Sequence, residues 1–358
     1  MQVQSVLPEF ARVNSRVLPG LIKQQPADFE VIEKLAFDPL GEGEHAFLFV
    51  RKTGLTTMEL VQRIASLAGV ARRFVSYAGL KDKHAITHQW FSVHLPAKQA
   101  PDWRLLENSH IQVLRSTRHN KKLRRGQIVA NQFAVVIREL EWTGQALDSF
   151  LLRIKREGVP NYFTEQRFGI QGRNLDKALA LDTSDESGVK RESRKYKTKR
   201  VSQQQGLYLS AARSLLFNLV VSARIERQNW NKAVDGDVWM KAGRHGMFSA
   251  DVIDQDIEDR IAAGLISPTG PLFGVKPLLP GGAALQIEQA AMANNVRYQT
   301  LLLNRQVKAD RRALRLMPKY LQVRELSNSS VKLEFELPRG SYATAVLREL
   351  IKYPGQMA

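Results

Sequence analysis

The sequence of 358 residues contains no cysteine. Without thiols the chain cannot form disulfides, thiolate zinc sites, iron–sulfur clusters or a cysteine nucleophile, and such a composition is typical of cytoplasmic proteins. No apolar run approaches the roughly eighteen residues of a membrane span, and the first twenty residues lack the charged stub and apolar stretch of a secretory signal. We therefore expect a cytoplasmic protein that does not span a membrane.

Glycine-rich nucleotide loops are also missing. GEGEHA (41–46) fits the loose dinucleotide pattern, but it precedes an expected strand and is predicted to be a turn. There is no Walker loop and no Gly-x-Ser-x-Gly elbow. His84 and His88 are four residues apart, but HAITH offers no third metal ligand. We therefore expect neither a cofactor nor a metal.

Acidic residues are few relative to basic ones. Lys and Arg number 53 against 35 Asp and Glu, which gives a net charge of +18 and favours a polyanionic partner, nucleic acid before an anionic membrane surface. Two basic clusters stand out: RSTRHNKKLRRG (115–126), and KRESRKYKTKR (190–200), which includes Tyr196. Either cluster alone would be interpreted as a solvated loop. In a chain of this charge we expect both to contact phosphates.

Hydrophobic patterns divide the chain into three parts. Residues 1–157 alternate expected strands (29–37, 44–52, 89–95 and 127–140) with helices at 56–69 and 146–158; Thr56 and Glu59 form a capping box at the start of the first helix. Residues 158–318 are predicted to be more helical, with helices near 209–228 and across 285–316 and a loop at 267–274. Strand patterns return in a hairpin at 321–337. We expect an α+β (mixed α/β) core, 1–157 and 319–358, interrupted by an inserted domain, 158–318.

A lone carboxylate, Asp82, lies between two lysines in AGLKDKHAITHQW (78–90). Two expected strands flank this loop, and nearby positive charge would favour the ionised carboxylate. Such a group beside an RNA groove suits nucleophilic or acid–base chemistry at a sugar carbon. Phe29 and Phe133 could stack on an extruded base, and Asn131 could bind its amide edge, although alternation alone places Phe133 in the core. These patterns predict an RNA-binding protein and leave open whether Asp82 is catalytic.

Specific blocks of the chain resemble the TruD family of tRNA pseudouridine synthases. The similarity covers nearly the whole sequence and includes AGLKDKHAITHQW (78–90), RRGQIVANQFAVVIRE (124–139), GVPNYFTEQRFG (158–169) and FELPRGSYATAVLREL (335–350). The resemblance implies a pseudouridine-synthase core with a mainly antiparallel sheet, split by an inserted domain. It implies conversion of uridine 13 in the D-arm of tRNA to pseudouridine, with no cofactor or metal.

The same resemblance implies roles for individual residues. Asp82 matches the catalytic aspartate, and Phe29, Asn131 and Tyr342 match substrate-contacting positions. Phe133 matches an aromatic residue of the pocket, and Lys23 a basic residue nearby. Two positions depart from the family pattern: Thr164 stands where glycine is frequent, and Tyr342 where some members have phenylalanine.

Two other functions are compatible with this composition. One is a non-catalytic protein that binds or folds tRNA on the same scaffold; the intact sequence around Asp82 argues against it. The other is a cofactor-dependent RNA-modifying enzyme, which the missing glycine-rich loop disfavours. The residues leave open whether the carboxylate attacks C1′ or removes a proton from C2′. No protein partner is implied, and we expect a monomer.

Overall fold

The computed structural model describes residues 7–96, 99–142, 144–183, 203–244 and 246–352. The chain forms two compact units. The sheet unit comprises Leu18–Leu151 and Pro318–Gly340; the helical unit comprises the preceding residues up to Val17, Leu152–Met317 and the stretch from Ser341 onward. Helices combined with largely antiparallel sheets confirm the α+β class. The chain after 318, expected as one piece, is divided at Gly340.

The sheet unit is built on nine strands in the described residues, in the order β15-β16-β8-β3-β6-β4-β7, with β2 beside β8 and β5 beside β6. Of these pairings, β3 with β6 is parallel and the others are antiparallel. The strands are β2 (Leu21–Ile22), β3 (Phe29–Leu35), β4 (His45–Thr53), β5 (Val75–Tyr77), β6 (Ile86–His94), β7 (Ile111–His119), β8 (Ile128–Arg138), β15 (Lys319–Ser327) and β16 (Ser330–Pro338). Long-range pairing therefore joins residues from both ends of the chain.

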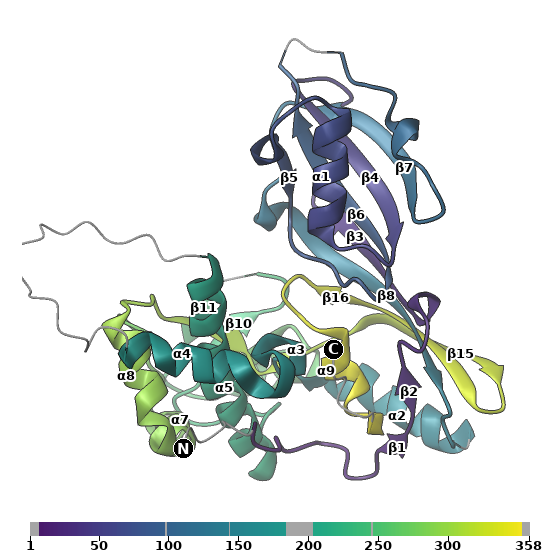
Figure 1. Cartoon of the computed structure of the whole chain (residues 1–358). Helices are drawn as coiled ribbons and strands as arrows, with labels where there is room; N and C mark the ends of the chain where they lie inside the picture. The colour runs from purple at the N-terminus through teal and green to yellow at the C-terminus, as the bar shows by residue number, and fades with distance from the viewer. Residues whose placement is uncertain (1–6, 97–98, 143, 184–202, 245, 353–358) are drawn as a thin grey trace, which may run out of the picture. The chain divides into compact units, whose positions relative to one another are not determined.

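Helix α1 (Thr57–Leu67) covers one face of β4 and β6, as Figure 1 shows. The predicted capping box is confirmed: the Thr56 side chain accepts a hydrogen bond from the Glu59 amide, and the Glu59 carboxylate accepts one from the Thr56 amide at 2.6 Å. Gly69, with φ of 60°, supplies the left-handed residue that ends the helix. Leu60 and Ile64 are fully buried against Phe91 and neighbouring strand residues.

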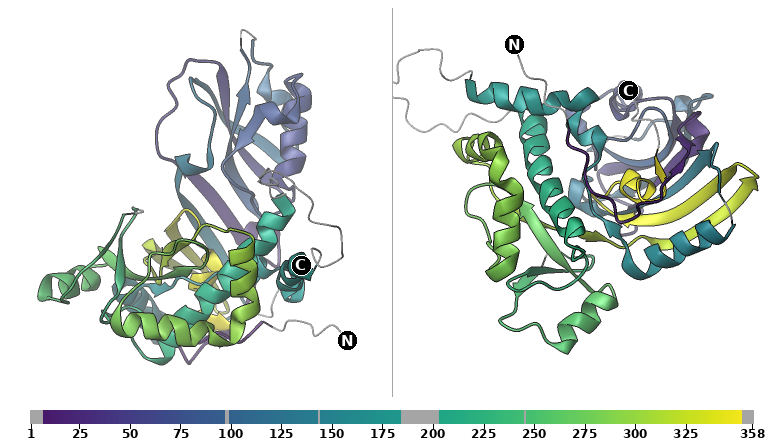
Figure 2. Two further views of the ribbon diagram at one scale, coloured as in Figure 1. Left: turned by 90° about the vertical axis from the view of Figure 1, so that its left-hand side faces the viewer. Right: turned by 90° about the horizontal axis from the view of Figure 1, so that it is seen from below.

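The helical unit packs its core around α5 (Gln203–Glu226), which contacts α4 (Arg173–Thr183), α7 (Gly282–Met292) and α8 (Val296–Asn304). In Figure 2 α7 and α8 lie beside α5. The unit also holds a sheet in the order β11-β10-β12-β13. The unit's other strands and helices are β9 (Val159–Pro160), α3 (Glu165–Phe168), β10 (Val238–Lys241), β11 (Met247–Ser249), α6 (Gln255–Ala262), β12 (Ile266–Leu272), β13 (Asp310–Ala313), β14 (Arg315–Leu316), α9 (Ala343–Leu347) and β17 (Ile351–Lys352). Helix α2 (Gly144–Glu157) runs across the boundary at Leu152.

Two expectations for this unit were wrong. The helical run predicted across 285–316 ends with α8, and β13 and β14 follow it. The loop predicted at 267–274 contains most of β12, which pairs with strands on both sides although it contains two prolines. Gly270 allows the close packing there, because an added Cβ would lie 2.9 Å from Leu314 Cδ2 and 3.2 Å from the Phe217 ring.

Within the described residues, one helix reaches the length and hydropathy of a membrane span, contrary to the expectation that no stretch does. The segment is Gln204–Glu226 of α5, and 61% of its most apolar window is buried inside the protein. The apolar character of α5 follows from its place at the centre of the helical unit, where it packs against neighbours on several sides.

Candidate active site

One face of the sheet brings together three of the predicted site residues. In the antiparallel pairing of β3 with β8, Phe29 lies opposite Val135, Val31 opposite Phe133, and Glu33 opposite Asn131. Directly opposed residues point to the same face, and alternate residues along a strand do so as well. Phe29, Asn131 and Phe133 therefore share one face of the sheet unit.

Aromatic rings pack closely on this face. Phe133 stacks on Phe335 of β16 at a centroid distance of 5.5 Å and meets Phe29 edge-on at 6.2 Å. Phe29 is 4% exposed and Phe133 9%. Both rings thus contribute to the packing of the unit, and contact with a base stays a prediction that must be tested with the fold intact.

The loop that carries Asp82 joins β5 to β6 and is fixed by hydrogen bonds to three elements. The Lys81 amide donates to Thr57 Oγ1 of α1 at 2.9 Å, and Gln89 Nε2 of β6 donates to the Gly79 carbonyl at 2.6 Å. Lys52 of β4 donates to the backbone carbonyl of Asp82 at 3.1 Å. The loop was expected to be held by the strands on either side of it, and side chains of α1, β4 and β6 hold it through hydrogen bonds to its backbone.

Lys23 forms an ion pair with the Asp82 carboxylate, with 2.8 Å between Nζ and Oδ2. The two side chains are 12% and 22% exposed, so the pair is partly accessible. The Lys23 ammonium also lies 4.4 Å from the centre of the Phe29 ring. Its backbone has φ of 56°, a left-handed conformation that is unfavourable for lysine and that occurs often at functional sites.

The flanking lysines were predicted to supply positive charge at Asp82, and this stays a prediction; the Lys81 side chain contacts residues of β3 and β8. The Lys81 ammonium lies 2.8 Å from Glu33 Oε1 and 2.9 Å from Asn131 Oδ1. Sequence neighbours in a loop diverge readily, and Lys81 turns toward the buried carboxylate of Glu33, whose side chain is 1% exposed. Burial raises the pKa of Glu33, and the Lys81 ammonium opposes that shift.

Lys52 is a second cation that the sequence did not reveal as part of the site. It is fully buried, and its ammonium donates to the Leu55 carbonyl at 2.7 Å as well as to Asp82. Burial lowers the pKa of Lys52 to about 8, and the negative charge of Asp82 partly opposes the shift.

A single pattern could have revealed both Glu33 and Lys52. Each is a charged residue at the inward-facing position of an alternating strand, Glu33 after Val31 and Lys52 after Val50. Charged side chains at such positions are seldom buried without a partner, so they indicate a polar network.

Tyr342 belongs to the helical unit, where it precedes α9. Its ring meets Phe163 at 6.0 Å, and the Arg167 guanidinium lies 5.8 Å from its centroid. Arg312 lies over Phe163 at 4.2 Å, and burial lowers the pKa of Arg312 to about 10. Tyr342 is therefore set among aromatic and cationic side chains, while the other five predicted site residues lie in the sheet unit.

Thr164 adopts φ of −97°, so its backbone does not require the glycine that is frequent in the resembled pattern. Its hydroxyl accepts a hydrogen bond from Thr344 Oγ1 at 2.9 Å, and the residue is 4% exposed. The hydroxyl of the side chain that Thr164 carries in place of glycine thus has a hydrogen-bond partner in Thr344.

The first basic cluster, 115–126, occupies the end of β7 and the loop before β8 in the sheet unit. Its exposed cations are Arg115, Lys121, Lys122, Arg124 and Arg125. The second cluster, 190–200, lies outside the described residues. Contact of these exposed cations with phosphates stays a prediction.

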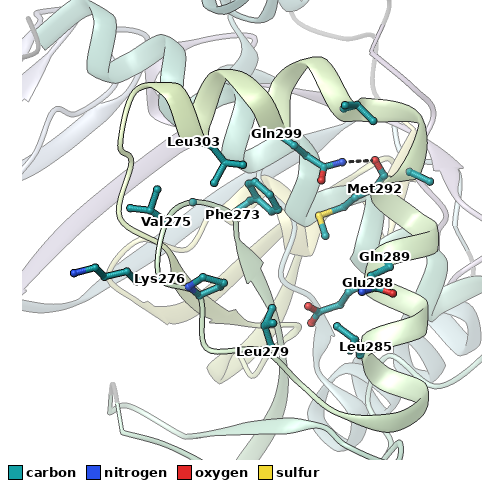
Figure 3. Close-up of a pocket in the computed structure, with 14 residues that line it drawn as sticks. Phe273, Val275, Lys276, Leu279, Leu285, Glu288, Gln289, Met292, Gln299 and Leu303 are labelled. Atoms are coloured by element: carbon teal, nitrogen blue, oxygen red, sulfur yellow. Dashed lines mark hydrogen bonds between the residues drawn. The ribbon is translucent and has the colours of Figure 1, made fainter.

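A cavity of about 570 Å³ lies in the helical unit, bounded by α7, α8 and the segment after β12 (Figure 3). Phe273, Leu285 and Met292 line it with other mostly apolar residues, and Gln299 donates to the Met292 carbonyl at 2.8 Å. None of the predicted site residues lines this cavity. Among the described residues no cluster of three or more histidines and carboxylates could hold a metal ion.

The family model described as tRNA pseudouridine synthase D (TruD) matches residues 13–178 and 196–350. This chain belongs to the TruD family. It is 45% identical over 337 residues to a tRNA pseudouridine synthase D of Methylococcus capsulatus, covering 94% of this chain and 92% of the relative. It is 40% identical over 354 residues to a tRNA pseudouridine synthase D of Xanthomonas euvesicatoria pv. vesicatoria, covering 98% and 95%. The predicted family resemblance is thereby confirmed.

Structural comparison supports the same fold. The crystal structure of a tRNA pseudouridine synthase D (TruD) candidate from Methanosarcina mazei matches with a TM-score of 0.70 at 22% identity, covering 95% of each chain. At this identity the match shows the α+β fold alone. The individual residue roles assigned to Asp82, Phe29, Asn131, Phe133, Tyr342 and Lys23 remain predictions.

Proposed function

We propose that this protein is a tRNA pseudouridine synthase that isomerises uridine 13 of the D-arm without a cofactor, with Asp82 as its catalytic residue. The observation that carries the proposal is the Asp82 carboxylate, paired with Lys23 beside Phe29 in a member of the TruD family. The relatives' names supply the reaction and the substrate class.

The reaction requires a carboxylate at the ribose and an enclosed place for the base. The N1–C1′ bond breaks, the uracil turns, and a C5–C1′ bond forms, while C5 loses its proton and N1 gains one. Asp82 can attack C1′, or it can remove the C2′ proton to give a glycal. Both routes use the ionised carboxylate, which the neighbouring Lys23 ammonium favours.

The base must leave its stack to reach Asp82, because a uridine of a folded D-arm is stacked in the RNA. Extrusion costs roughly a few kcal/mol. The exposed cations of the 115–126 cluster can offset this cost through phosphate contacts, and the net charge of +18 favours association in general.

A non-catalytic tRNA-binding protein is the alternative from another class, and one assay separates the two. Purified full-length protein is incubated with unmodified tRNA and no added cofactor, and pseudouridine is mapped chemically at each uridine. We expect pseudouridine at position 13 with wild type and none with Asp82→Asn or Asp82→Ala, which should bind tRNA almost as well as wild type.

Three results would contradict the proposal in different parts. Wild-type protein that binds tRNA without modifying it would support the non-catalytic alternative. Turnover by either Asp82 variant would remove Asp82 from its role, and modification at another uridine would overturn position 13 while leaving the reaction type in place.

A further inference from the structure

The orientation of the Asn131 side chain follows from its neighbours. Glu33 lies directly opposite Asn131 in the β3–β8 pairing, and the Lys81 ammonium bridges them, 2.8 Å from Glu33 Oε1 and 2.9 Å from Asn131 Oδ1. An ammonium group donates hydrogen bonds and cannot accept them. The Asn131 amide must therefore turn its oxygen toward Lys81, which leaves the NH₂ end, with two donors, for a ligand.

Glu33 holds Lys81 in this position. Its second oxygen, Oε2, accepts a hydrogen bond from the Trp90 amide of β6 at 2.9 Å, so the carboxylate is fixed to the sheet backbone. With the Glu33 side chain 1% exposed and Lys81 14% exposed, either charge would be left poorly solvated without the other. The three side chains of Glu33, Lys81 and Asn131 form one ordered relay.

We propose that Lys81, held by Glu33, is a positioning residue that fixes the Asn131 amide with its N–H donors toward the base, so that the site selects a pyrimidine with a carbonyl at C4 over one with an amino group there. This inference rests on the proposed function, because it takes an extruded uridine as the ligand of this face. It goes further by assigning the choice between uracil and cytosine to the relay.

The selection of uracil over cytosine follows from the hydrogen-bonding group that each base carries at C4. Uracil presents an acceptor, O4, at the position where cytosine presents an amino donor. An amide locked with its donors outward pairs with O4, whereas against cytosine two donors would meet and both would lose their partners. If Lys81 is removed, the amide can rotate by about 180° and offer its oxygen to cytosine.

The test measures binding by full-length protein in the Asp82→Asn background, so that no ligand reacts. Two tRNA transcripts are compared at one salt concentration, identical except for uridine or cytidine at the target position. Their affinity ratio cancels the phosphate contacts, which are common to both. With Lys81 present we expect uridine to be favoured roughly tenfold, the effect of about one hydrogen bond.

Lys81→Met should reduce this ratio to less than twofold, and Lys81→Arg should restore part of it. Lys83→Met is the matched control, since Lys83 is exposed and flanks Asp82 on the other side. It removes the same charge, and it should weaken the binding of both transcripts while leaving their affinity ratio unchanged. A ratio that survives in Lys81→Met, or that falls equally in Lys83→Met, would overturn the proposed role.

Asn131→Asp provides a second test if Lys81→Met does not fold. A carboxylate beside Lys81 presents acceptors alone, so the preference should move toward cytidine; an unchanged preference for uridine would refute the relay as the selector. The proposed function fails separately, if wild-type protein with Asp82 intact forms no pseudouridine. The inference fails when wild type forms pseudouridine and the Lys81 and Asn131 variants still discriminate as before.

Discussion

The buried Lys52 gives a prediction whose size follows from the structure. Its pKa falls from 10.5 to about 8 on folding because its ammonium is fully buried. One pKa unit corresponds to about 1.4 kcal/mol, so the charged form costs roughly 3 kcal/mol of folding free energy at neutral pH. Between pH 8 and 10.5 the unfolded chain binds more protons at this residue than the folded chain does. Its unfavourable contribution therefore disappears as pH rises through this range.

The perturbation is Lys52→Met, which keeps an unbranched side chain and removes the titrating group. The variant also loses the hydrogen bonds to Leu55 and Asp82. Because that loss is present at both pH values, the change in relative stability with pH reports only the charge of the Lys52 ammonium. We expect the stability of the variant relative to wild type to fall by about 2 kcal/mol between pH 7 and pH 9.5.

Two measurements check this prediction on the full-length protein. In NMR spectra of protein labelled with ¹³C at the lysine side chains, one resonance that is missing from the variant should titrate with a midpoint near 8. Urea unfolding of both proteins at the two pH values gives the change in relative stability. A midpoint above 10, or a stability difference that does not depend on pH, would refute the reasoning from burial.

The remaining predictions concern the site and the RNA-binding surface. Phe133→Ala should lower the free energy of unfolding by roughly 3 kcal/mol, because Phe133 is packed between two rings. Phe133→Leu should preserve the fold and reduce turnover through loss of stacking on the base. Denaturation measures the packing role of Phe133, and single-turnover kinetics measure its contact with the base. Lys23→Met should lower turnover roughly ten- to a hundredfold through loss of the charged contact to Asp82, and Lys23→Arg should be less affected. Wild-type activity in Lys23→Met would remove Lys23 from the site. A Lys121→Ala/Lys122→Ala double variant should reduce the slope of log affinity against log salt by about 2, and an unchanged slope would exclude both from phosphate contact.

Alternation along single strands was a reliable guide to the sheet unit. The strand expected at 89–95 lies largely within β6, and its alternating residues Phe91 and Val93 are both buried against α1. The capping box at Thr56 was equally local, since both of its members lie within four residues. Such features could be predicted because they depend on neighbours in the sequence.

Features that depend on distant partners were missed. Arg311 and Arg315 fall in the stretch predicted to be helical, but they lie in β13 and β14 and are buried: Arg311 pairs with Glu288, and Arg315 donates to the carbonyl of Glu157 at 2.6 Å. These partners stabilise strands at 310–316, where the apolar period alone suggested a helix. The bridge between Glu33 and Asn131 was hidden for the same reason, because it requires the register of β3 against β8.

The pairing of β3 with β8 has a further consequence for how an RNA is accommodated. Asn131 is carried by a strand that is hydrogen-bonded to β3 on one side and to β16 on the other, and the Asp82 loop is tied to α1, β4 and β6. Groups mounted in this way have little freedom to follow a ligand. Crystal structures of the protein with and without RNA should therefore superpose closely at these side chains of the sheet unit. The RNA should undergo most of the rearrangement.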